Sequence, residues 1–172
     1  MAGIVASVPL SPVVPRLYVS GKNVARQLTE LRKAGVTAIV NATPTLPNHF
    51  ESEGILYKRI AVDDTPQDDL SAHFEAAATF IQEARSAGRS VLVHCQAGVS
   101  RSVSLVAAYL VRHENMSLLE AMARIRAVRP MAWPNQGFWR QLIKWELDIR
   151  GSVSVDVDMI DRQKSTLAFV LA

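Results

Sequence analysis

The sequence predicts an α/β fold in which helices flank a central, mostly parallel sheet on both sides. Short β-branched segments alternate with segments of helical periodicity, the order expected when crossover helices join parallel strands. The run Ser90–His94 has an apolar interior without alternation, as in a strand covered on both faces. A length of 172 residues suits one such domain.

The first half of the chain contains three strand candidates and two helix candidates. Asn23 can cap the first helix, Gly35 can end it, and Gly88 can end the second. An acidic loop precedes the second helix. In chain order the candidates are the strand Leu17–Val19, the helix Asn23–Gly35, the strands Val36–Val40 and Ile55–Val62, and a helix from Phe74 to Gly88.

The second half contains one strand candidate followed by three helices. Ser117 and Glu120 form a capping box that marks the start of the middle helix. The candidates are the strand Ser90–His94, an apolar helix from Ser102 to His113, a helix from Ser117 to about Arg129, and a last helix from Gln136 to Ile149.

The composition excludes several classes of protein. With 19 basic and 16 acidic side chains, the net charge of +3 is too small for a nucleic-acid footprint. No apolar run reaches the roughly 18 residues of a membrane span. The single cysteine cannot form an intramolecular disulfide, which favours a reducing compartment, the cytoplasm or the nucleus. We therefore expect no nucleic-acid partner and no transmembrane segment.

Both ends of the chain are expected to lie outside the folded domain. Residues 1–13 are apolar, but prolines interrupt them and they lack the basic start of a secretory signal, which indicates an extended arm. Near the other end, alternation at Val153, Val155 and Val157 predicts an edge strand, and residues 167–172 are again apolar. The expected division is an arm at 1–13, a domain at 14–150 and an extension at 151–172.

The chemistry concentrates where the strand Ser90–His94 meets the next helix. Cys95 leaves the strand and faces a helix N-terminus, where free N–H groups and the helix dipole favour a thiolate. Arg101 adds a planar guanidinium that can bind two phosphate oxygens. The N–H groups that can cradle a tetrahedral oxyanion come from Gln96, Ala97, Gly98, Val99 and Ser100.

The alternative for Cys95 is a small, inert buried side chain, as most isolated intracellular cysteines are. That interpretation leaves unexplained why a histidine precedes it and why glycine, arginine and serine follow at these spacings. All of them lie at the carboxyl end of a strand, where open α/β sheets bind ligands. We therefore interpret Cys95 as a nucleophile.

The segment His94-Cys95, five residues and Arg101-Ser102 matches the signature of the cysteine-dependent protein tyrosine phosphatases and resembles its dual-specificity branch, in particular the small atypical members. The likeness covers roughly residues 14–150. Further matching segments are Thr37–Thr43, Asp64 with Leu70, Arg129-Pro130, Pro134–Trp139 and Gln141–Ile143. The resemblance implies a protein tyrosine phosphatase-like sandwich that hydrolyses phosphotyrosine, phosphoserine and phosphothreonine through a phosphocysteine, without metal or organic cofactor.

Such a reaction needs an acid to protonate the departing oxygen. The acidic loop offers Asp63, Asp64, Asp68 and Asp69, and spacing alone does not choose among them. Asp68 and Asp69 are expected to cap the following helix. The resemblance selects Asp64, six residues before Leu70, as the acid that later activates water.

The resemblance also assigns supporting roles, each beside a simpler interpretation. His94 maintains the geometry of the cysteine or is only a satisfied core residue. Ser102 stabilises the departing thiolate, caps the helix, or does both. Asn135 supports the phosphate-binding loop or merely reverses the chain in its Pro-Asn-x-Gly turn. Trp133 is either a core aromatic residue or a rim contact for a phosphotyrosine ring.

Two other functions use the same residues. One is a phosphatase for a non-protein substrate, such as an RNA 5′ end or a phosphorylated carbohydrate. The other is a phosphate-binding scaffold that docks a kinase or an adaptor. The loop interior contains no lysine or arginine before Arg101, which disfavours an inositol lipid. We expect phosphorylated proteins as substrates, with kinases of signalling cascades as candidate partners.

Overall fold

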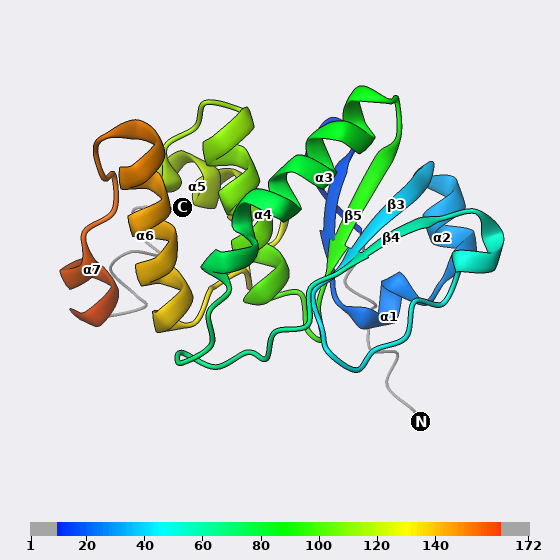
Figure 1. Ribbon diagram of the computed structural model, residues 1–172, viewed down its shortest axis with the longest axis horizontal. Helices are drawn as coiled ribbons and strands as arrows, with labels where there is room; N and C mark the ends of the chain where they lie inside the picture. The colour runs from blue at the N-terminus through cyan, green and yellow to red at the C-terminus, as the bar shows by residue number, and fades with distance from the viewer. Residues whose placement is uncertain (1–9, 163–172) are drawn as a thin grey trace.

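Five strands form one sheet in the computed structural model, which describes residues 10–162 (Figure 1). Their order across the sheet is β1-β2-β5-β3-β4. The strands are β1 (Ser11–Val14), β2 (Leu17–Ser20), β3 (Val36–Asn41), β4 (Leu56–Arg59) and β5 (Ser90–His94). Strands β2, β5, β3 and β4 are parallel, and β1 pairs antiparallel with β2. The predicted mostly parallel sheet is confirmed.

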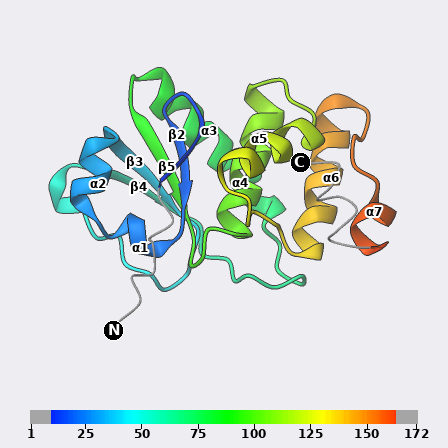
Figure 2. The ribbon, with the colours of Figure 1, turned by 180° about the vertical axis from the view of Figure 1, so that it is seen from behind.

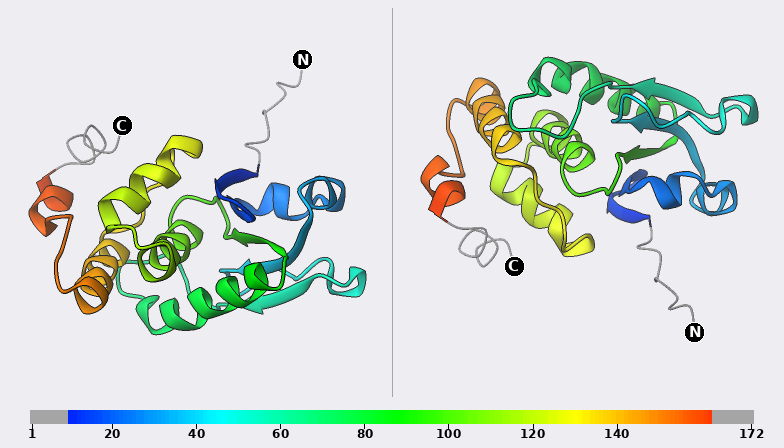
Figure 3. Two further views of the ribbon diagram at one scale, coloured as in Figure 1. Left: turned by 90° about the horizontal axis from the view of Figure 1, so that it is seen from above. Right: turned by 90° about the horizontal axis from the view of Figure 1, so that it is seen from below.

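Helices lie on both faces of this sheet (Figure 3). One face carries α1 (Lys22–Ala25) and α2 (Leu28–Lys33). On the other face, α3 (Phe74–Ser86) and α4 (Arg101–His113) contact β5. Around α4, far from α2, pack α5 (Leu118–Val128) and α6 (Gln136–Arg150), and α7 (Val157–Arg162) packs against α6 (Figure 2). The short 3-10 helices are η1 (Glu51–Glu53) and η2 (Ser71–His73).

Alternating strand side chains divide the core into two layers. In β5, Val91 and Val93 join the larger apolar cluster beneath α3 and α4. Leu92, between them, joins the smaller cluster beneath α1 and α2. All three side chains are fully buried. Because both faces of β5 are covered, the strand needs apolar residues at successive positions, which explains its lack of alternation.

The expected helix Asn23–Gly35 is wrong as one element. Gly21, not Asn23, precedes α1, and the chain leaves helical geometry at Gln27, whose φ and ψ are −109° and 89°. Because of this break, the two short helices contact different parts of the fold. The N–H of Lys22 donates to the carbonyl of Gln96 at 3.1 Å, while α2 packs against β3.

The segments at both ends also differ from expectation. Ser11–Val14, expected mostly as arm, form the edge strand β1, and residues 1–9 lie outside the described residues. The alternating valines do not form an edge strand. Val155 is buried against the core whereas Val153 is about half exposed, and Val157 begins α7. The apolar run 167–172 also lies outside the described residues.

A buried carboxylate joins the segment after α6 to the rest of the fold. Glu146, only 1% exposed, accepts hydrogen bonds from the N–H of Leu118 at 2.8 Å and from the N–H and hydroxyl of Ser154 at 2.8 and 2.7 Å. The negative charge therefore lies at the N-terminus of α5, where the helix dipole favours it.

No helix within residues 10–162 combines the length and the apolar character that a membrane crossing requires.

Candidate active site

The predicted strand–loop–helix unit lies in the middle of the carboxyl edge of the sheet. Strand β5 pairs with β2 on one side and with β3 on the other, and it ends at His94. The N–H of Ala42, just after β3, donates to the carbonyl of His94 at 2.8 Å. Parallel strands end at the same edge, so the segments after β2 and β3 flank Cys95.

Cys95 lies beneath the loop formed by residues 96–100, with an exposed fraction of 1%. Its Sγ accepts a hydrogen bond from the N–H of Gly98 at 3.2 Å. The hydroxyl oxygen of Ser102 lies 3.3 Å from the same sulfur. Two polar hydrogens can therefore point at the sulfur.

The carbonyl groups of four consecutive loop residues bind the surrounding scaffold. The bonds run from Lys22 N to Gln96 O (3.1 Å), from Arg129 Nη2 to Ala97 O (2.9 Å), from Arg129 Nε to Gly98 O, and from Trp133 N to Val99 O (2.8 Å). The carbonyl and the N–H of one peptide plane point in opposite directions. The N–H groups of residues 97–100 are therefore directed into the loop, as in backbone nests that bind anions.

Gly98 makes this loop geometry possible. Its φ of +69° lies in the left-handed region, which costs a residue with a Cβ additional free energy. A Cβ at this position would lie 2.5 Å from the Nη2 of Arg129 and 2.5 Å from the carbonyl carbon of Ser20. The loop can approach its scaffold this closely only with glycine here.

Arg129 has a structural role in the site that its place in the sequence did not reveal. It is 2% exposed, and its guanidinium binds the loop carbonyls of Ala97 and Gly98 from behind. Burial lowers the pKa of Arg129, and the opposing influence comes from the charge of Cys95. The available signal was a basic residue at the end of an apolar helix, directly before a proline.

Arg101 and Asp64 lie on the other side of the loop. Arg101, the first residue of α4, is 8% exposed, and its Nη1 donates to the carbonyl of Val62 at 3.0 Å. Its Nε lies 3.9 Å from Oδ2 of Asp64 and forms no hydrogen bond within the described part of the chain. The structure thus brings two segments together: the acidic loop with Asp64 lies beside Arg101, at the end of the loop that begins with Cys95.

Asn135 connects the acidic loop to α6. Asn135 is the N-cap residue of α6, and its Oδ1 accepts a hydrogen bond from the N–H of Phe138 at 3.0 Å. Its Nδ2 donates to Oδ1 of Asp64 at 2.9 Å. Its backbone N–H donates to the hydroxyl of Ser100 at 3.0 Å. Asn135 therefore contacts both the loop after Cys95 and the acidic loop, and it does more than reverse the chain.

Two of the other three aspartates of the acidic loop bind local partners. Asp69 accepts hydrogen bonds from the hydroxyl of Ser71 and the N–H of Ala72, which lower its pKa. It is not the expected helix cap, because the N-cap positions of η2 and α3 are Leu70 and His73. Asp68 does not cap the helix, because its carboxylate binds the hydroxyl of Thr65. Asp63 is exposed.

His94 is a buried residue, with 4% of its surface exposed. Burial lowers its pKa to about 4, and the nearby His49 and Arg59 act in the same direction. The ring is therefore neutral at neutral pH. Its Nδ1 lies 3.4 Å from the carbonyl of Cys95, a contact within the loop backbone.

Two further predictions can be compared with the geometry. Ser102 does not cap α4, because the N-cap position is occupied by Ser100. Trp133 is half-buried, with its ring edge-on to Trp139 at 5.5 Å and the guanidinium of Arg126 at 5.5 Å from its centroid. Its contact with the core is therefore real, and its contact with substrate stays a prediction.

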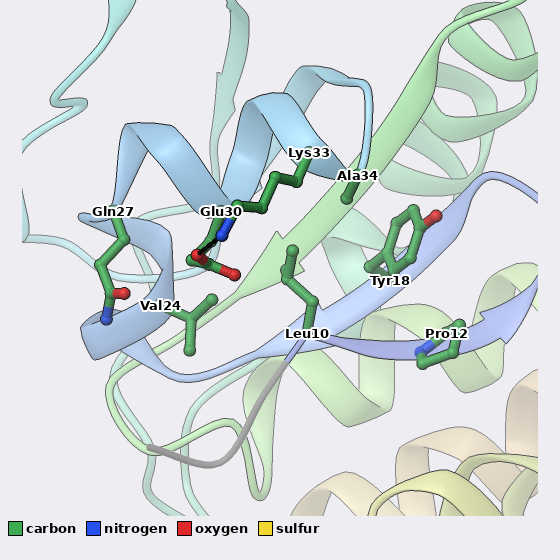
Figure 4. Close-up of a pocket in the computed structure, with 8 residues that line it drawn as sticks. All are labelled: Leu10, Pro12, Tyr18, Val24, Gln27, Glu30, Lys33 and Ala34. Atoms are coloured by element: carbon green, nitrogen blue, oxygen red, sulfur yellow. Dashed lines mark hydrogen bonds and ion pairs between the residues drawn. The ribbon is translucent and has the colours of Figure 1, made fainter. Parts of the chain in front are cut away.

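A separate cavity of about 580 Å³ lies between the β1–β2 edge and helices α1 and α2 (Figure 4). It contains none of the predicted site residues. Its lining is formed by Leu10, Pro12, Tyr18, Val24, Gln27, Glu30, Lys33 and Ala34. The polar members include an ion pair, Lys33 with Glu30, at 2.8 Å. None of the residues from Cys95 to Arg101 lines this cavity.

Comparison with known proteins agrees with this geometry. The family model of the dual specificity phosphatase catalytic domain matches residues 17–148. The chain belongs to the dual specificity phosphatase family. Dual specificity protein phosphatase 26 of Bos taurus is 40% identical over 143 residues, covering 80% of this chain and 67% of the relative. Dual specificity phosphatase 28 of Homo sapiens is 39% identical over 138 residues, covering 80% and 78%.

A solved structure is similar throughout this domain. The crystal structure of human dual specificity phosphatase 28 has a TM-score of 0.79 and 37% identity, covering 83% of this chain and 95% of that one. The family assignment, the sandwich fold and the protein phosphatase activity inferred from the sequence are confirmed. Neither alternative function is favoured by these relatives.

Proposed function

We propose that this phosphatase acts through a phosphocysteine on Cys95, with Arg101 and the loop N–H groups binding the phosphoryl oxygens. The observation that carries the proposal is the Nε of Arg101, a buried donor with no acceptor among the described residues. Buried donors are almost always paired. A phosphoryl oxygen would pair this one. A similar mouse structure of the family (TM-score 0.81, 34% identity) is complexed with zinc tungstate, which contains a tetrahedral oxyanion.

In the first step, the Cys95 thiolate attacks phosphorus as the bond from phosphorus to the serine, threonine or tyrosine oxygen breaks. Asp64, in its neutral form, donates its proton to that departing oxygen. Support for Asp64 comes from its carboxylate, 3.9 Å from Arg101 and bound to Asn135, whereas Asp68 and Asp69 are occupied by local hydrogen bonds. Preorganised donors in the loop stabilise the charge of the transferring phosphoryl group.

In the second step, water attacks phosphorus and the sulfur–phosphorus bond breaks. Asp64, now ionised, accepts the proton of the water, and inorganic phosphate leaves. The electron pair returns to Cys95, where the Ser102 hydroxyl, at 3.3 Å, and the Gly98 N–H, at 3.2 Å, stabilise the thiolate. We expect loss of the Ser102 hydroxyl to slow this step most.

The proposed substrates are phosphorylated proteins, and we propose kinases of signalling cascades among them. The side chains of residues 96–100 carry no positive charge that would bind the extra phosphates of an inositol lipid. A reducing compartment, the cytoplasm or the nucleus, keeps a catalytic thiolate active.

The test measures hydrolysis of peptides that carry phosphotyrosine, phosphothreonine or phosphoserine. Two non-protein substrates are compared with them: an uncapped RNA with a 5′ phosphate and a phosphorylated glucan. Wild-type protein should favour the peptides. The Cys95→Ser variant should lose hydrolysis and keep phosphopeptide binding, and full activity in that variant would refute the nucleophile. Preferential hydrolysis of RNA or glucan would instead refute the substrate class.

The aspartate assignment is tested by a matched pair. Asp64→Ala should lower turnover of phosphotyrosine peptides by about two to four orders of magnitude, the usual contribution of a general acid. Asp63→Ala, one residue away and exposed, should retain most of the activity. The opposite result would move the acid to Asp63.

A further inference from the structure

The acidic loop has little apolar anchorage of its own. Residues 63–67 are exposed, and the buried apolar side chains that bound the loop are Val62 and Leu70. Such segments are held in one conformation only where their polar groups are bound by something rigid. In this protein that rigid element is the first half of α6.

Gln141 forms the densest set of these bonds. Its Oε1 accepts the N–H groups of Leu70 at 2.9 Å and of Ser71 at 2.8 Å. Its Nε2 donates to the carbonyl of Asp68 at 2.8 Å. One side-chain amide therefore fixes three backbone groups at the carboxyl end of the acidic loop, about 70 positions away in the sequence.

The same helix contacts the loop at two further points. Asn135 binds the carboxylate of Asp64 itself. Gly137 brings the backbone of α6 so close to the loop that an added Cβ would lie 2.0 Å from the carbonyl oxygen of Pro66. The three contacts lie on the N-cap and first two turns of α6, so they present one stiff surface to the whole loop.

We propose that Gln141 is a positioning residue for proton transfer by Asp64. It touches no reacting atom, and it acts by keeping the acidic loop against α6 so that the Asp64 carboxyl remains beside Arg101. This inference rests on the proposed general-acid role of Asp64. Loss of the Gln141 side-chain amide should impair protonation of the leaving oxygen. The oxyanion cradle around Cys95 should stay unchanged, because no hydrogen bond of Gln141 reaches residues 95–101.

The experiment compares aryl phosphates whose leaving phenols range from strongly acidic to as basic as tyrosine. An acidic phenol departs without a proton, so its release does not need the acid. Gln141→Met, which keeps the side-chain volume but not the hydrogen bonds, should lower kcat/KM on phosphotyrosine by about 10- to 100-fold. On the most activated aryl phosphate kcat/KM of the same variant should stay within about threefold of wild type, because kcat/KM reports only the steps up to departure of the phenol and not the later attack of water.

Three further measurements distinguish a positioning role of Gln141 from a general structural role. Lys144→Ala is the matched control. Lys144 lies one turn further along α6 and pairs with Asp148 of the same helix, so this variant should behave as wild type on all substrates. Gln141→Glu keeps an acceptor for Leu70 and Ser71, and it should recover part of the loss. Inhibition of Gln141→Met by tungstate should equal that of wild type, because the cradle is intact.

Several outcomes would overturn the inference. A loss of equal size on every substrate, or weaker tungstate inhibition, would show that Gln141 supports the fold or the cradle instead. If the variants do not fold, amide exchange in the wild-type protein decides: the N–H groups of Leu70 and Ser71 should exchange as slowly as those of α6, and rapid exchange would refute the clamp. An inactive wild-type protein would refute the proposed function, a result separate from any difference between variants.

Discussion

His94 should make the stability of this protein fall steeply in mild acid. Burial lowers its pKa from an ordinary 6.5 to about 4. Between these two values the unfolded chain binds a proton that the folded protein does not, so falling pH favours unfolding. The contribution of neutral His94 is complete above pH 6.5 and is lost as the pH approaches 4.

The size of the effect follows from the same two values. Each pH unit between them corresponds to about 1.36 kcal/mol, which gives a loss of about 3 kcal/mol across the window. The imidazole is 4% exposed, so solvent screening reduces this little. Against a typical total of about 5–15 kcal/mol, a loss of this size is readily measured.

Urea denaturation at several pH values between about 7 and 4.5 measures the free energy of unfolding directly. His94→Gln, which does not titrate, removes the contribution of His94, although its stability at neutral pH also changes. The slope with pH is therefore the quantity to compare. Acidic side chains and His113 remain in both proteins and cancel. Parallel curves for wild type and variant would refute the proposed effect of burial on His94.

Three further changes test the scaffold. Gly98→Ala should lower kcat/KM by about 100-fold, because the added Cβ displaces the loop and misplaces its N–H groups. Gly54→Ala is the control, since Gly54 also has a positive φ but has open space around it, and this variant should remain active. Equal kinetics of the two variants would contradict the prediction. Arg129→Met should weaken tungstate inhibition and lower the melting temperature, since two loop carbonyls lose their partner, and unchanged inhibition would count against it. Glu146→Ala should cost about 3 kcal/mol in urea denaturation, and a cost near zero would exclude its role in joining α5 to the following segment.

Local signals were enough to predict most of the sheet and the nucleophile loop. Strand β5 and the helix after it are recognisable because burial on all sides demands apolar residues, and such runs are visible in one dimension. The position of Cys95 between them follows from chain order alone. Two local patterns were misleading, however. The periodicity of residues 23–35 did not show the break at Gln27, and the alternating valines after residue 150 imitated a strand.

The sequence by itself determined the α/β architecture, the loop from Cys95 to Arg101 and, through its likeness to the phosphatases, the chemistry. Only the tertiary structure decided which residues hold that chemistry in place. Arg129 supports the loop from behind, and Gln141 holds the acidic loop from about 70 residues away. The physical reason is that strand and helix patterns arise from neighbouring residues, whereas a buried polar group takes whatever partner the packed chain brings within hydrogen-bond distance.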